Sequence, residues 1–92
     1  MATLMHQGVE LGEPSDFETW VETRQGGGFS RRCQFSLSGR LSAVDLKSSG
    51  LWVRLEDGSV WDLRVLRSSR GADACVYVTS AQLEPVPRGL AA

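Results

Sequence analysis

The stretch from Leu51 to Leu66, LWVRLEDGSVWDLRVL, constrains the fold more than any other part of the chain. An Asp-Gly dipeptide between two alternating apolar and polar runs is the strongest short-range signal for a β-hairpin. A two-residue loop would place Val53 opposite Asp62 and would mix apolar and charged side chains on both faces. A three-residue loop (Glu56, Asp57, Gly58) separates them, so we predict this register. Gly58 then takes the left-handed conformation that suits glycine.

This register gives the hairpin one core face and one solvated face, as in an antiparallel sheet or a small barrel. The core face carries Leu51, Val53, Leu55, Trp61, Leu63 and Val65. The solvated face carries Trp52, Arg54, Val60, Asp62 and Arg64.

The rest of the composition fits one small domain. The chain has 92 residues, of which 41% are hydrophobic and 23% are charged, as in ordinary globular proteins. The net charge of −1 gives no global attraction to nucleic acid or membrane. The charge is uneven, however: residues 1–30 hold five acids against one arginine, whereas residues 31–70 hold eight bases against four acids. A basic middle segment therefore follows an acidic N-terminal third.

The segments before the hairpin are expected to form a flexible lead-in (residues 1–13) and one short helix. Pro14-Ser15-Asp16 is typical of a helix start, and the spacing of Phe17, Trp20 and Val21 fits one helical face. The predicted helix covers residues 15–25 and ends at a glycine hinge, Gly26-Gly27-Gly28. It is too short to be stable alone, so its apolar face must pack on the rest of the domain or on a partner.

The remaining segments predict strands. Cys33, Phe35 and Leu37 alternate with polar residues, and the apolar pattern continues past Gly39 as one long bent strand. Two further strands follow the hairpin, in residues 74–80 and 81–86, with Pro85 confining the last one to an edge. We therefore expect a mainly β fold in which a short N-terminal helix precedes a five-stranded, strongly bent antiparallel barrel, Sm-like or SH3-like. The domain would span residues 14–88, followed by a frayed tail (residues 89–92).

The segment Gly39-Arg40-Leu41-Ser42-Ala43-Val44-Asp45 resembles the G-x-L-x-x-Φ-D core of the first Sm motif, where Φ is apolar. The end of the chain, residues 81–87, is similar to the closing strand of Sm-like proteins. Shortly after the aspartate of the first motif, Sm proteins usually have an asparagine, and this chain has Lys47-Ser48-Ser49-Gly50 there instead. The resemblance implies a small barrel, ring formation through edge strands and RNA contact near residues 45–49. SH3-like barrels have a similar number of strands.

The sequence gives little reason to expect catalysis. His6 is the only histidine, and no Ser/His/Asp, Cys/His or metal-ligand arrangement is present, so we expect no catalytic residue, no metal, no cofactor and no small-molecule substrate. Cys33 and Cys75 are interpreted as reduced thiols of a cytoplasmic protein, with a disulfide left open. No apolar run is long enough to span a membrane.

Two binding functions remain. The first is a protein-binding adaptor or inhibitor that docks on a larger machine through Trp52, Arg54 and Arg64, because exposed tryptophan and arginine are enriched at interface hot spots. The alternative is an Sm-like protein that binds RNA or single-stranded DNA. Its expected contacts are Phe29, Arg31, Arg32, Arg67 and Arg70. A homodimer or ring through the last edge strand is also left open.

Overall fold

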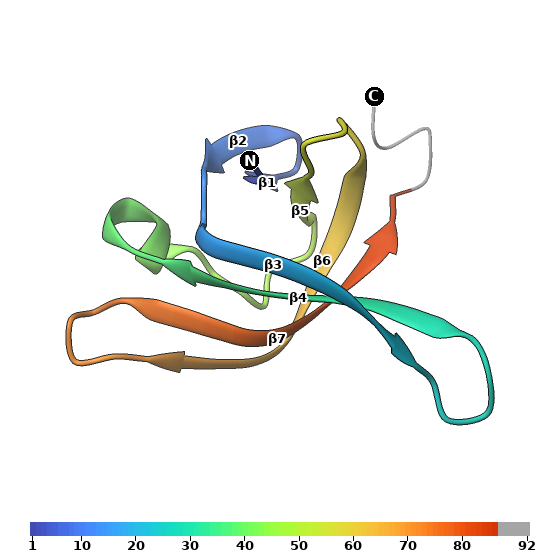
Figure 1. Ribbon diagram of the computed structural model, residues 1–92. Helices are drawn as coiled ribbons and strands as arrows, with labels where there is room; N and C mark the ends of the chain where they lie inside the picture. Colours follow the sequence, from blue (N-terminus) through green and yellow to red (C-terminus); the bar gives the residue numbers. More distant parts are fainter. Residues whose placement is uncertain (87–92) are drawn as a thin grey trace.

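The computed structural model describes residues 1–86, which form one open antiparallel sheet of seven strands in the order β2-β1-β5-β6-β7-β4-β3 (Figure 1). A short 3-10 helix, η1 (Gly39–Ala43), follows β4. The strands are β1 (Thr3–His6), β2 (Val9–Gly12), β3 (Ser15–Thr23), β4 (Phe29–Leu37), β5 (Leu51–Arg54), β6 (Val60–Arg70) and β7 (Val76–Pro85).

The sheet curls without closing. Its two edge strands, β2 and β3, are neighbours in sequence, joined only by Glu13 and Pro14. Figure 1 shows the long strand β6 connecting the short strands β1, β2 and β5 to the long strands β7, β4 and β3. Because β2 leads directly into β3 through these two residues, the two edges of the sheet approach each other at this junction. The inner side of the curl is the core face.

Burial of one sheet face holds the fold together. Alternate residues of six strand segments converge on the inner side, and Leu4 on β1 packs opposite Val53 on β5. The buried apolar cluster on this face is Ala2, Leu4, Cys33, Phe35, Leu37, Leu51, Val53, Leu63, Val76, Val78, Ala81 and Leu83. Phe17 of β3 stacks on Phe35 with ring centroids 6.0 Å apart. Apolar burial over these strands is the main stabilising contribution to the fold.

The predicted hairpin is confirmed with its register. Val53 pairs with Trp61, the Leu55 N–H donates to the Ser59 carbonyl at 2.9 Å, and Gly58 has φ of +86°. The predicted core face is buried or packed against the core, whereas the opposite face is half-buried or exposed. The hydrophobic pattern and the turn residues therefore select the same three-residue loop.

The predicted helix over residues 15–25 is wrong, because these residues form the edge strand β3. Phe17 and Val21 are four positions apart, which fits two strand repeats as well as one helical turn. Trp20 lies on the opposite face from both, and Val21 pairs with Arg31 in a long hairpin with β4. Gly26-Gly27-Gly28, with φ of +92°, +107° and +82°, forms the turn of this hairpin rather than a hinge.

Other expectations on the fold also need correction. The expected lead-in, residues 1–13, supplies β1 and β2, and Leu4 is fully buried. The chain past Gly39, where φ is +60°, turns into η1 instead of continuing as a bent strand. The two strands expected after residue 74 are one strand, β7, which lies inside the sheet with Pro85 at its end. The five-stranded barrel is replaced by an open sheet of seven strands, and the predicted tail (residues 89–92) lies outside the described residues.

Candidate functional site

The β5–β6 turn fixes the orientation of Trp61. The Asp57 carboxylate accepts hydrogen bonds from the Ser59 N–H at 2.9 Å and from the Ser59 hydroxyl at 2.5 Å. The Trp61 indole Nε1 in turn donates to the Ser59 hydroxyl oxygen at 2.8 Å. The hydrogen bonds from Ser59 lower the pKa of Asp57, so this carboxylate stays ionised at neutral pH. The turn residues therefore hold the indole in one position on the inner face.

Arg31 completes an aromatic and cationic cluster on that face. Its guanidinium lies over the Trp61 ring, 5.0 Å from the centroid, which is cation–π geometry. Around this pair is a hollow of about 420 Å³, which we call the hairpin-tip groove. It is lined by Val21, Arg24, Phe29, Arg31, Trp61, Leu83, Glu84 and Pro85.

The apolar lining of the hairpin-tip groove is exposed. Phe29 is 71% exposed and Val21 is 57% exposed, although both lie on the face that forms the core farther along the sheet. The reason is that the β3–β4 hairpin extends beyond the strands that would cover it. The inner face therefore continues past the core as an uncovered apolar surface beside a fixed Trp–Arg pair.

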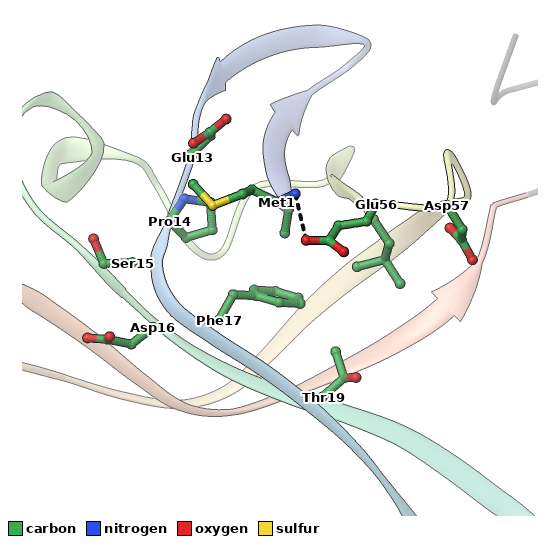
Figure 2. A pocket seen from close by; sticks show the side chains of 11 residues that line it. Met1, Glu13, Pro14, Ser15, Asp16, Phe17, Thr19, Glu56 and Asp57 are labelled. Atoms are coloured by element: carbon green, nitrogen blue, oxygen red, sulfur yellow. Dashed lines mark hydrogen bonds and ion pairs between the residues drawn. The ribbon is translucent and has the colours of Figure 1, made fainter.

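A second hollow, which we call the junction pocket, lies at the other end of β3 and has a volume of about 610 Å³ (Figure 2). One wall is β3 with the chain leading into it, and the opposite wall is the start of β1 and the β5–β6 turn. Figure 2 shows the Phe17 ring between the two walls. The lining is Met1, Ala2, Glu13, Pro14, Ser15, Asp16, Phe17, Thr19, Leu55, Glu56 and Asp57. It thus combines an apolar floor with four carboxylates, and the Met1 ammonium donates to one of them, Glu56, at 2.9 Å.

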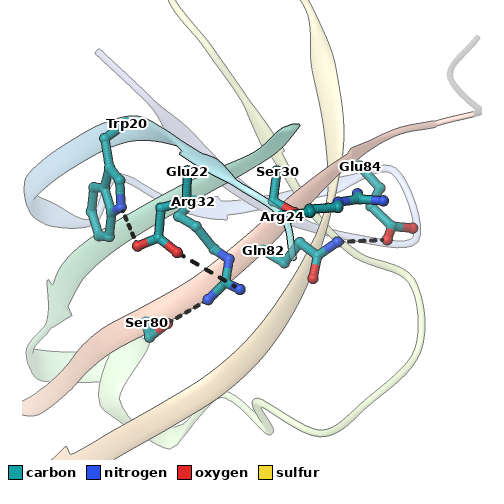
Figure 3. Close-up of polar contacts among 8 residues, drawn as sticks. All are labelled: Trp20, Glu22, Arg24, Ser30, Arg32, Ser80, Gln82 and Glu84. Carbon is teal, nitrogen blue, oxygen red and sulfur yellow. Dashed lines mark hydrogen bonds and ion pairs between the residues drawn. The ribbon is translucent and has the colours of Figure 1, made fainter. Parts of the chain in front are cut away.

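The outer face of β3 is held by polar contacts (Figure 3). The Trp20 indole N–H donates to Glu22 at 2.9 Å, and the Arg32 guanidinium lies 3.9 Å from the same carboxylate. Arg32 also donates to the Ser80 hydroxyl at 3.3 Å, which links β4 to β7. Glu18 accepts a hydrogen bond from the neutral Gln34 amide at 3.0 Å. Glu22 is therefore partly neutralised by a cation, whereas the partner of Glu18 carries no charge.

The structure places the predicted protein contacts Trp52, Arg54 and Arg64 on one outer face, as expected from their parity. Trp52 is half-buried, Arg54 forms an ion pair with Glu10, and Arg64 is exposed. On this face Asp62 also lies opposite Glu84. Burial, followed by the charge of Glu84, raises the pKa of Asp62.

The predicted nucleic-acid contacts do not form one surface. Phe29 and Arg31 lie together in the hairpin-tip groove, whereas Arg32 lies on the outer face, where it lines a separate hollow with Arg67. Arg70 lies at the far end of β6, where its guanidinium donates to the Ser42 carbonyl at 3.2 Å. The arginines of the basic middle segment are therefore spread over different faces and partners.

Residues 1–86 also contain potential metal ligands and two cysteines. No group of three or more His, Cys, Asp or Glu side chains there is arranged to hold a metal ion. Cys33 and Cys75 are free thiols, and burial raises the pKa of Cys33 to about 12. In this part of the chain no helix has the length and apolar character needed to cross a membrane.

Only two of the eight groove residues, Phe29 and Arg31, are among the contacts predicted from sequence. Val21 falls within the predicted helix, and Trp61 falls on the predicted core face. The alternation of β-branched residues at Thr19, Val21 and Thr23 is the signal that could have indicated a strand in this segment. No comparable signal marks how far the hairpin extends beyond the core.

No protein family, curated protein or solved structure matches the chain.

Proposed function

We propose that this chain is a protein-binding module, an adaptor or inhibitor that docks on a larger assembly and carries out no catalytic step. The observation that carries the proposal is the hairpin-tip groove, where Phe29 and Val21 are exposed beside the Trp61–Arg31 pair. Aromatic side chains and arginine are the residues most enriched at interface hot spots. Exposed apolar side chains gathered at one place favour an interaction site.

The arrangement of the groove is suited to binding because it is already formed. The β5–β6 turn fixes Trp61, and Arg31 is held over the indole ring. Arg24, at the end of the same hairpin, donates from Nε to the Ser30 hydroxyl at 2.6 Å. Side chains that are already ordered lose less conformational entropy on association, which favours affinity.

The outer face with Trp52, Arg54 and Arg64 is a second, weaker candidate within the same proposal. Arg54 is already paired with Glu10, and Trp52 offers only part of its ring because it is half-buried. An interface at this face would have to break or share the ion pair. In the hairpin-tip groove, a partner can contact the exposed Phe29 without breaking an ion pair.

The alternative function is binding of RNA or single-stranded DNA, which is favoured by Phe29 and Arg31 lying in one groove. An aromatic ring and an arginine together can stack a base and contact a phosphate. Glu84 also lines this groove, however, and Arg32 already has Glu22 as a charged neighbour. These carboxylates disfavour a polyanion, so the protein-binding function is the better supported of the two.

The test is capture of partners from a host lysate on immobilised protein, with and without nuclease, at low and at moderate salt. We expect a defined protein that survives nuclease and moderate salt and is lost with Phe29→Ala. Val9→Ala is the matched control, because Val9 is a 65% exposed residue on β2, at the opposite edge of the sheet. Nucleic acid captured at low salt only would replace the proposal with the alternative. Equal capture of the partner by both variants would show that the hairpin-tip groove is not the binding site.

A further inference from the structure

The two hollows lie along the same side of one strand. After the register shift between Ser15 and Glu18, the inward-facing residues of β3 are Phe17, Thr19, Val21 and Thr23. Phe17 and Thr19 line the junction pocket, and Val21 lines the hairpin-tip groove. β3 pairs with β4 on one side only and ends the sheet, so among residues 1–86 its other side carries backbone groups without a strand partner. An uncovered strand edge that connects two hollows is a template for another strand.

We propose that the partner binds by strand addition: an extended segment pairs antiparallel with the free edge of β3, and its inward side chains enter the two hollows. This inference rests on the proposed protein-binding function and specifies its mode. The main-chain hydrogen bonds would supply affinity, and the hollows would select side chains at alternate positions.

The charges along β3 define the partner segment. Glu18 has only a neutral partner, and the junction pocket next to it carries the carboxylates of Glu13, Asp16, Glu56 and Asp57, of which Glu56 is already paired with the Met1 ammonium at 2.9 Å. At the other end, Val21 and Phe29 are apolar and exposed. In an antiparallel arrangement, the N-terminal half of the partner segment lies beside Val21 and should be apolar. Its C-terminal half lies beside Glu18 and should carry lysine or arginine.

A second copy of the chain fits this edge poorly. Two β3 strands paired antiparallel about Trp20 would bring Glu18 of each copy opposite Glu22 of the other. Like charges directly opposite each other on one face destabilise a strand pair. In this register the edge therefore favours a cationic strand from another protein over self-association.

The geometry also explains why β3, and not the other edge, is the docking strand. β2 has four residues, and its pairing with β1 is irregular between Leu4 and Met5. β3 pairs regularly with β4 from Glu18 to Thr23, a length of roughly 20 Å at about 3.4 Å per residue. Before Glu18 the pairing shifts, and Asp16 has φ of +54°. The added strand should therefore pair along Glu18–Thr23 and end at the junction pocket.

The experiment uses the full chain and a capped peptide of about eight residues, enough to cover this length. The peptide alternates Val and Thr in its N-terminal half and Val and Lys in its C-terminal half. Controls are the same peptide with Glu in place of Lys and a peptide with the two halves exchanged. Affinity is measured by calorimetry at low and moderate salt, and amide hydrogen exchange is followed by NMR.

We expect the Lys peptide to bind best and to slow exchange of amides within Glu18–Thr23 at least several-fold. Glu18→Lys should weaken the Lys peptide roughly tenfold and strengthen the Glu peptide. Val21→Asp should weaken binding, whereas the matched Val9→Asp on β2 should not.

Three results would overturn the proposal: no binding at low salt, binding that leaves exchange in β3 unchanged, or protection of β3 by self-association without peptide. These are separable from failure of the proposed function. If Phe29→Ala still abolishes partner capture while β3 stays unprotected, protein binding stands and strand addition fails.

Discussion

Phe29 and Phe35 lie on the same strand and inner face of the sheet, and they differ in whether anything covers them. Phe29 is 71% exposed, whereas Phe35 is 3% exposed and stacks on Phe17. Substitution of each by alanine removes the same side chain from β4 and makes a similar change in strand propensity. The difference between the two variants therefore isolates the burial of the ring.

The expected costs follow from the exposed fractions. Full burial of a phenylalanine side chain contributes about 1.5–3 kcal/mol, so the three-tenths buried at Phe29 is worth about 0.5–0.9 kcal/mol. Phe35→Ala removes a fully buried ring and leaves a cavity, which costs about 3–5 kcal/mol. The two variants should therefore differ in free energy of unfolding by roughly 2–4 kcal/mol.

Urea unfolding followed by far-ultraviolet circular dichroism measures both values, with the slope m expected to be the same for all proteins. Sedimentation at the same concentrations controls for self-association. A loss above about 2 kcal/mol for Phe29→Ala would show that the ring is covered in the free protein. That result would refute the reasoning that leads to the hairpin-tip groove, because an occupied surface would not be available to a partner.

Three further predictions concern the turn, the outer face and the thiols. Gly58→Ala should lower the free energy of unfolding in urea by about 1–2 kcal/mol. The cause is backbone strain alone, because φ is +86° and the added Cβ meets no atom within 4 Å. Gly58→Asn should cost less, and equal costs for the two variants would contradict backbone strain as the cause. Asp62→Asn should stabilise the fold at neutral pH by about 0.2–1 kcal/mol, because it removes a carboxylate that is partly desolvated and lies opposite Glu84. Because folding raises the pKa of Asp62, the ionised carboxylate destabilises the folded protein only as pH rises above the pKa of the unfolded carboxyl. The gain in stability from Asp62→Asn should therefore vanish near pH 3, at roughly which Asp62 is protonated in both the folded and the unfolded protein. A gain that does not change with pH would refute this explanation. A thiol reagent at pH 8 should label Cys75 in the folded protein but reach Cys33, with a pKa of about 12, only after denaturation; equal labelling rates would contradict the burial.

The hairpin could be predicted from sequence because everything that determines it is local. Asp57 and Gly58 specify the turn, and the alternation from Leu51 to Val65 specifies which side chains face the core. The same holds for β4, where Cys33, Phe35 and Leu37 alternate and are buried. In each case the local pattern and the tertiary burial agree, so the sequence alone is enough.

Other errors come from long-range pairing. Leu4 is buried because β1 adds to β5, almost fifty residues away in sequence, and no short-range pattern in residues 1–13 indicates this. The candidate site was predicted only in part: Phe29 and Arg31 were selected for their chemistry, but their position beside Trp61 depends on pairing of β4 with β7 and β6. Contacts between distant strands determine which side chains share a hollow.

β3 was the hardest element to predict, and the physical reason bears on the proposed binding mode. An edge strand pairs on one side only, and on β3 only Phe17 and Trp20 are half-buried, so few positions carry a pattern that separates strand from helix. Its acidic residues, Glu18 and Glu22, fit a solvated helical face equally well. On a free edge, these charges oppose pairing with a second copy and leave the edge open to a strand of opposite charge. The features that made β3 ambiguous in sequence are therefore those that would keep it unpaired until a cationic partner binds.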